Sequence, residues 1–196
     1  MLKKEKRMNY DTALTFLKNI GRKLHLQITL LTPGEERDFP VDLGLRGFLG
    51  LDDRYDKLFR DTIIQLEDNI LYRLTDEFFC SYLFLILPDT PRHTALIAGP
   101  YITFEASHEK IVAEAERCGV PPWLYRRLEN YFASIPVIQD PSVLLNVFTA
   151  FGETIWGEFQ IVDVNHVQQV PSVVKFSQVR FCLCSSVSTL SYDFHQ

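Results

Sequence analysis

The stretch Asn69–Thr103, NILYRLTDEFFCSYLFLILPDTPRHTALIAGPYIT, decides the fold of this chain. It contains three apolar runs that are typical of strands: Asn69–Leu74, Phe79–Leu87 and Thr94–Thr103. The short gaps between them hold Thr, Asp and Pro, which favour turns. Strands joined this closely must pair antiparallel, because parallel pairing needs a long crossover. Gly99-Pro100 interrupts the third run, so we expect a bulge or an edge position there.

Patterns typical of amphipathic helices flank this stretch on both sides. Apolar residues recur every three or four positions, which places them on one face of a helix. The predicted helices are Asp11–Leu24, Leu51–Leu66, Ser107–Cys118, Pro121–Phe132 and Asp140–Gly157, and a further short strand is Gln27–Leu31. We therefore expect an α+β fold with a central antiparallel sheet flanked by helices. Both faces of Phe79–Leu87 are apolar, so helices should cover both faces, or one face should line a cavity.

The composition is that of an ordinary globular protein. The 196 residues are 46% hydrophobic and 23% charged, with a formal net charge of −5. Such an acidic chain is a poor candidate for binding nucleic acid over its whole surface. The basic run Lys3–Arg7 predicts a solvated tail, because no apolar segment follows it as in a signal peptide. The sequence contains no run of about 18 apolar residues, the length needed to cross a membrane, so we expect no membrane partner.

The cysteines and the short motifs indicate neither an enzyme nor a cofactor. Cys80, Cys118, Cys182 and Cys184 form no disulfide framework, which favours a reducing cytoplasm. The Cys-Leu-Cys triplet at 182–184 lacks the further ligands of a zinc site, and the His-Glu pair at 108 lacks a second histidine four residues on. The glycines between 44 and 50 lack the Lys-Ser/Thr of a phosphate-binding loop. We therefore expect no catalytic residue, no metal and no cofactor.

The segment Ile111–Phe132 has roughly the spacing of a helix-turn-helix, with Arg126-Arg127 in its second helix. A double proline in the first turn of that helix and the negative net charge favour a different interpretation. We expect a pair of helices that packs beside the sheet, and no DNA binding by this chain alone.

Aromatic residues gather in and around the predicted sheet and define a candidate ligand site. Tyrosine and cysteine at alternating strand positions would give an apolar wall with a few polar groups, the usual lining of a small-molecule site. The candidate ligand-binding residues are Tyr72, Cys80, Tyr82, Phe84 and Tyr101. The alternative is a packed aromatic core that binds nothing. Burial in its apolar run should raise the pKa of Cys80, so we expect this thiol to be inert.

The composition changes after Gly157. Residues Phe159–Gln196 hold only four charges and show no helical stripe. We expect a sensor-like domain over residues 9–157, followed by an atypical tail over 158–196 that is too short to be an independent domain. Its valines and phenylalanines favour strands added to a sheet edge, in this chain or in a partner.

Several segments resemble the N-terminal regulatory regions of AraC-type transcriptional regulators from Firmicutes. They are YRLTDEFFCSYLFLILPD, LIAGPYIT, GVPPWLYRRLENYFASIPVI and ETIWG, and the resemblance covers roughly Asp11–Gly157. Those regions are similar to PAS/GAF-type sensor domains. The resemblance therefore implies a PAS/GAF-like fold and a cytoplasmic sensor that controls a C-terminal DNA-binding domain, which this chain lacks.

These observations predict a ligand-sensing regulatory domain of a transcriptional regulator that binds a small-molecule effector. The amphipathic segments at its two ends, Asp11–Leu24 and Asp140–Gly157, are natural elements for a homodimer. The alternative is a ligand-free module for dimerisation or interaction.

Overall fold

The computed structural model describes residues 2–33, 40–50, 66–76, 78–88 and 93–165. Its elements are α1 (Leu2–Lys23), β1 (Ile28–Leu31), α2 (Leu45–Phe48), β2 (Ile70–Thr75), β3 (Ser81–Ile86), β4 (Ala95–Tyr101), α4 (His108–Arg117), the short 3-10 helix η1 (Pro122–Leu124), α5 (Tyr125–Ser134), α6 (Ser142–Trp156) and β5 (Gln160–Asn165). The expected helix Leu51–Leu66 falls outside the described residues except for Leu66, and Cys182 and Cys184 also fall outside them.

The strands form a five-stranded sheet in the order β1-β4-β3-β2-β5. The predicted meander of three consecutive antiparallel strands is confirmed, because β2 pairs antiparallel with β3, and β3 with β4. The short strand β1 pairs antiparallel with β4 at one edge. At the other edge β5 pairs parallel with β2, so the sheet is mixed and the expectation of a purely antiparallel sheet is wrong there. A parallel pair is possible because a long connection through α4, α5 and α6 precedes β5.

A bulge interrupts the pairing of β3 with β4. Ser81 lies opposite Tyr101, whereas Leu83 lies opposite Ala98, so β4 holds one residue more than β3 over this interval. The bulge expected at Gly99-Pro100 is therefore confirmed. The edge position is wrong, since β1 pairs along the other side of β4. Gly99 has φ +141°, and a Cβ there would lie 2.8 Å from the Ser81 carbonyl oxygen, which explains the glycine.

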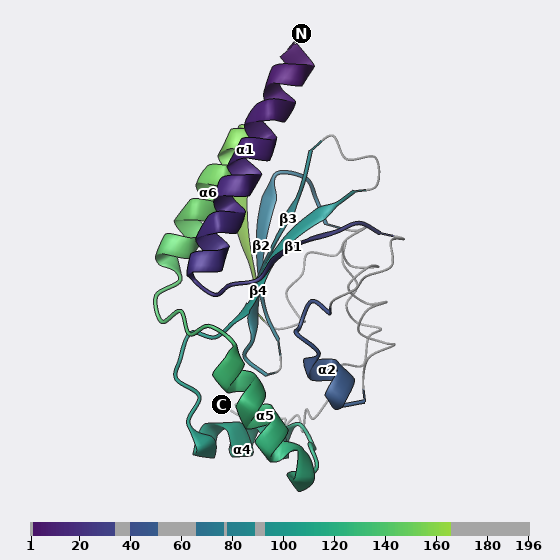
Figure 1. Ribbon diagram of the computed structural model, residues 1–196, viewed down its shortest axis with the longest axis vertical. Helices are drawn as coiled ribbons and strands as arrows, with labels where there is room; N and C mark the ends of the chain where they lie inside the picture. The colour runs from purple at the N-terminus through teal and green to yellow at the C-terminus, as the bar shows by residue number, and fades with distance from the viewer. Residues whose placement is uncertain (1, 34–39, 51–65, 77, 89–92, 166–196) are drawn as a thin grey trace, which may run out of the picture.

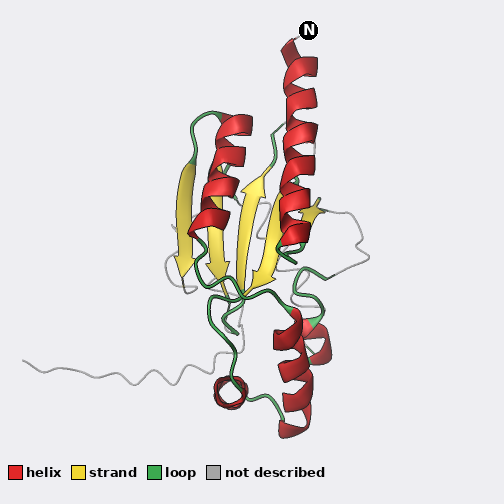
Figure 2. Cartoon of the chain, turned by 60° about the vertical axis from the view of Figure 1, so that its left-hand side comes forward, coloured by secondary structure: helices red, strands yellow, loops and turns green. Residues whose placement is uncertain are grey.

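Two long helices, α1 and α6, cover one face of the sheet (Figures 1 and 2). They pack on a mainly aliphatic layer from the central strands, formed by Leu71, Leu83, Leu85, Leu87 and Leu96. Leu17 of α1 and Phe148 of α6 are almost completely buried in this layer. The indole Nε1–H of Trp156 donates to the Ile86 carbonyl oxygen (2.9 Å), which fixes the end of α6 to the end of β3.

The opposite face of the sheet carries a second core. It includes Tyr72, Cys80, Tyr82, Phe84 and Ile86 from the sheet, Leu45 from α2, and buried residues of α4 and α5. Figure 1 shows α2 on the side of the sheet away from α1 and α6, with α4 and α5 at one end of the sheet. The expectation that both faces are covered is thus confirmed.

The helix ends follow the sequence signals closely. Ser107 caps α4 and accepts a hydrogen bond from the Lys110 backbone N–H (3.4 Å). α6 begins one residue later than the Asp140-Pro141 signal predicts, and Asp140 accepts from the Ser142 N–H (2.9 Å). The hydrogen bonds with Ser142 lower the pKa of Asp140. Lys3–Arg7, expected to be a solvated tail, are helical, because α1 already begins at Leu2.

The sheet continues past Gly157. β5 (Gln160–Asn165) lies in the segment expected to be a tail, and it adds an edge strand, as the apolar residues there suggested. A Cβ at Gly152 of α6 would collide with the Phe159 ring, so α6 packs closely against the start of this segment. The rest of the segment, residues 166–196, lies outside the described residues. Within the described ranges no helix has both the length and the apolar character needed to span a membrane.

Candidate functional site

Four of the five candidate ligand-binding residues share one face of the sheet. Tyr72, Cys80, Tyr82 and Phe84 belong to the core on the α2 side, and all are buried. Tyr101 is also buried, but it lies in the core under α1 and α6. Simple alternation along β4 would put Tyr101 on the same face as Ile97, and the extra residue of the bulge turns it to the other face. The structure therefore does not bring Tyr101 together with the other four.

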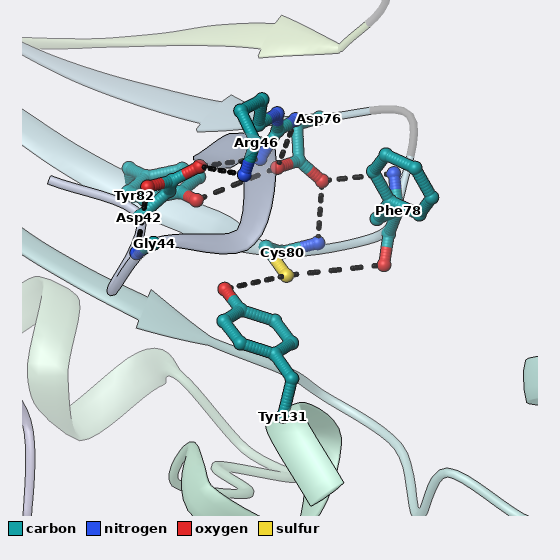
Figure 3. Close-up of polar contacts among 8 residues, drawn as sticks. All are labelled: Asp42, Gly44, Arg46, Asp76, Phe78, Cys80, Tyr82 and Tyr131. Atoms are coloured by element: carbon teal, nitrogen blue, oxygen red, sulfur yellow. Dashed lines mark hydrogen bonds and ion pairs between the residues drawn. The ribbon is translucent and has the colours of Figure 1, made fainter. Parts of the chain in front are cut away.

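A buried ion-pair network around Arg46 lies next to these residues (Figure 3). The Arg46 Nη2 atom is 2.8 Å from Asp76 Oδ2, and Nη1 is 3.6 Å from Asp42 Oδ2. The three side chains are only 2–3% exposed. The guanidinium carbon also lies 5.3 Å from the centre of the Phe78 ring, within range of a cation–π contact. Charged groups buried this deeply stay ionised only when they are paired.

Asp76 organises the turn between β2 and β3. Its Oδ1 atom accepts hydrogen bonds from the backbone N–H groups of Phe78 (2.9 Å) and Cys80 (2.8 Å). Its Oδ2 atom faces Arg46 and also accepts from the Tyr82 hydroxyl at 3.4 Å. One carboxylate thus sets the turn and reaches a residue of the candidate ligand site.

Asp42 has the same role in the segment before α2. Its Oδ1 atom accepts from the Gly44 N–H (3.0 Å) and its Oδ2 atom from the Arg46 N–H (2.8 Å). Gly44 has φ +84°, a left-handed conformation that glycine adopts without strain. Because Arg46 contacts both carboxylates, it connects the α2 segment to the β2–β3 turn.

Cys80 and Tyr131 connect α5 to the same β2–β3 turn. The Cys80 Sγ and Tyr131 hydroxyl oxygen are 3.7 Å apart, and both side chains are buried. Burial, and next the negative charge of Asp76, raise the pKa of the Cys80 thiol well above its usual value. Burial raises the pKa of Tyr131 as well. A thiol held neutral in this way is a poor nucleophile, as its apolar sequence context predicted.

Tyr72 and Phe84 complete the group of candidate residues on the α2 side of the sheet. The Tyr72 hydroxyl oxygen accepts a hydrogen bond from the Glu67 N–H (3.0 Å), and burial raises its pKa. The rings of Tyr82 and Phe84 lie 6.2 Å apart between centres. The arrangement combines an aromatic wall with hydroxyl, thiol and ionic groups. Chemically it suits the recognition of a small molecule with both apolar and polar parts.

The sequence interpretation missed Asp42, Arg46, Asp76 and Tyr131. Asp42 and Arg46 are four residues apart, a spacing that allows contact along a helix, but they lie in a segment where the sequence predicted no helix. Asp76 was interpreted only as a turn residue. Its contact with Arg46 joins positions thirty residues apart, and no local sequence pattern predicts such a contact.

Neither metal binding nor a helix-turn-helix receives support from the described residues. No group of three or more His, Cys, Asp or Glu side chains among them could hold a metal ion. The buried residues Ile111 of α4 and Leu128 of α5 belong to the core on the α2 side, which confirms that this helix pair packs beside the sheet. Arg126 and Arg127 are exposed, and the Arg127 guanidinium lies 5.1 Å from the centre of the Phe48 ring.

Comparison of the chain with protein-family models, curated proteins and solved structures found no significant match. The α+β class with flanking helices is established by the coordinates themselves. The likeness to AraC-type regulators and to PAS/GAF domains stays a prediction.

Proposed function

We propose that this chain is the ligand-sensing regulatory domain of an AraC-type transcriptional regulator, with a PAS/GAF-like fold and no enzymatic activity. It binds a small-molecule effector on the sheet face that carries Tyr72, Cys80, Tyr82 and Phe84, and it controls a DNA-binding domain. Tyr101, on the other face, takes no part in binding.

The contrast between the two faces of the sheet carries this proposal. The face under α1 and α6 is lined mainly by leucines and packs as an ordinary core. The other face places three tyrosines, a thiol and an ion-pair network in one buried region. Buried polar groups cost stability unless they are fully paired, so a core with no other role favours apolar residues. The leucine face holds the buried hydroxyl of Tyr101, but the ionic groups, the thiol and three tyrosines gather on the other face, as a binding site would require.

A thermal-shift screen of the chain against a library of small metabolites tests the proposal. A compound that binds only the folded state raises its stability by about 2.7 kcal/mol at a concentration of 100 times Kd, which moves Tm by several degrees. Tyr82→Phe removes the hydroxyl that donates to Asp76 and keeps the ring, so it should reduce this shift. Tyr101→Phe removes a buried hydroxyl on the opposite face and should leave the shift unchanged.

The alternative function is a ligand-free dimerisation or interaction module. The observation that favours it is the pairing of both Asp42 and Asp76 with Arg46 and with backbone N–H groups, which a purely structural network also requires. If no compound stabilises the folded chain, the result favours the ligand-free module. If a compound stabilises the parent and Tyr82→Phe equally, binding lies elsewhere and the assignment of this face is wrong.

A further inference from the structure

The strand β5 lies at one edge of the sheet, and its outer side is open to pairing. In the order β1-β4-β3-β2-β5, no described strand lies beyond β5. A strand at the edge of a sheet presents a row of backbone N–H and C=O groups, which is a template for another strand. The outer edge of β5 therefore offers hydrogen bonds that no described strand takes up.

The pairing with β2 determines which backbone groups of β5 face outward. The Gln160 N–H donates to the Asn69 carbonyl oxygen (3.1 Å), so the backbone groups of Gln160 point toward β2. Successive residues of a strand point these groups to opposite edges. In the parallel register with β2, Val162 therefore also faces β2, whereas Ile161 and Asp163 face away from the sheet. We call the N–H groups of Ile161 and Asp163 the outward amides.

The sequence of β5 lacks the usual protection of a free edge. Lysine, proline, a bulge or a charge that points inward discourages the approach of another strand. β5 reads QIVDVN, without lysine or proline, and its register with β2 is regular over all six residues. The side chain of Asp163, its single charged residue, is paired with Arg73 of β2. Ile161 is 48% exposed. A regular edge of this kind is one that another strand normally covers.

The chain itself provides a segment that suits this edge. Residues 166–196 follow β5 directly and lie outside the described ranges. Their sequence from Val173 to Leu183, VVKFSQVRFCL, is rich in β-branched and aromatic residues, which favour strands. Pro171-Ser172, immediately before it, favours a turn. A segment that begins where β5 ends can return antiparallel along the same edge after a short connection.

From the open edge and the segment that follows it, we propose that Val173–Leu183 pairs antiparallel with the outer edge of β5. The segment adds a sixth strand to the sheet and bonds to the backbone groups of Ile161 and Asp163. A second copy or another protein could use the same groups. An attached segment is favoured over both, because a short connection gives it an effective concentration on the order of millimolar.

Amide hydrogen exchange of the full chain, followed residue by residue by NMR, tests this pairing. Val162 is the internal reference, because its N–H is bonded to β2 whether or not the outer edge is covered. In the parent chain the outward amides should exchange within about tenfold of the rate of Val162. On a free edge they would exchange at least about a hundredfold faster than Val162.

Proline substitutions show whether this segment covers the edge. Val174→Pro combined with Val179→Pro removes two backbone donors and prevents a regular strand. One of these two positions faces β5 in any register, because one number is even and the other is odd. The double variant should speed exchange of the outward amides at least about a hundredfold and leave Val162 protected. Ser186→Pro combined with Ser188→Pro lies outside the segment, and this matched control should leave all three amides unchanged.

Nuclear Overhauser contacts between the backbones of β5 and Val173–Leu183 give a second measurement that needs no variant. Their absence in the parent, or outward amides that exchange rapidly there, would overturn the proposal. Protection that survives the proline pair would assign the edge to another occupant and would overturn it as well. Protection that falls on tenfold dilution would identify that occupant as a second copy of the chain.

Discussion

Replacing Arg46 by methionine probes the buried network that joins the α2 segment to the sheet. Methionine keeps an apolar stem of similar length and removes the guanidinium from between Asp42 and Asp76. Both carboxylates are about 3% exposed, so water cannot replace the lost cation. Breaking a buried ion pair by removing one partner costs about 3–5 kcal/mol. Asp76 keeps two backbone N–H donors on Oδ1, which offsets part of the loss, so we expect about 3 kcal/mol.

The sheet offers a matched control in the pair Arg73–Asp163. This pair also joins an arginine to an aspartate, but its side chains are 26% and 43% exposed. Arg73→Met should cost about 0–1 kcal/mol, as is usual for ion pairs at the surface, and added salt should reduce the effect further. The cost of Arg46→Met should be nearly independent of salt, because a buried pair is poorly screened.

Urea denaturation followed by circular dichroism measures both variants. The free energies of unfolding come from the midpoints and slopes, and an unchanged slope shows that the unfolding transition is comparable. Equal losses for Arg46→Met and Arg73→Met, or a loss below about 1 kcal/mol for Arg46→Met, would refute the reasoning that this network is buried and essential.

Three further predictions concern the core, the thiol and the last strand. Phe148→Ala should lower the free energy of unfolding by about 3–5 kcal/mol, whereas Trp123→Ala, at an exposed position, should change it by less than about 0.5 kcal/mol in urea titrations. The pKa of Cys80 is higher in the folded chain than in the unfolded chain, where it is about 8.5. The stability that depends on the neutral thiol is therefore fully present below about pH 8.5 and is lost as the pH rises toward the folded pKa. Cys80→Ala removes this titration, so the urea midpoint should fall less steeply at alkaline pH. A chain ending at Gly157 loses β5 and should melt at a lower temperature than one ending at Asn165.

The sequence predicted the parts of the fold that depend on neighbours in the chain. The meander of β2, β3 and β4 follows from short turns, and Ser107 and Gly157 mark helix ends through local hydrogen bonds and glycine conformations. β5 was foreseen only as an apolar segment that could join a sheet edge. Its parallel pairing with β2 joins residues about ninety positions apart, and the local sequence pattern of a strand does not show which distant strand it pairs with.

The candidate site was predicted in part for the same reason. Alternation along β3 correctly placed Cys80, Tyr82 and Phe84 on one face, because a strand has a strict period of two. Alternation failed for Tyr101, because one additional residue in β4 reverses the face of everything beyond it. The sequence did suggest the bulge through Gly99-Pro100, but not its consequence for the residue that follows.

The central strand β3 is the element through which the two faces of the sheet can influence each other. Its residues alternate between the polar face and the leucine layer, and all six are buried. An effector that displaced Tyr82 or Phe84 would therefore also move Leu83 and Leu85, which pack beneath α6. The hydrogen bond from Trp156 to Ile86 ties the last turn of α6 to the same strand. Because a ligand can shift an equilibrium only by binding one arrangement better than another, α6 must have two positions on this layer for a signal to pass.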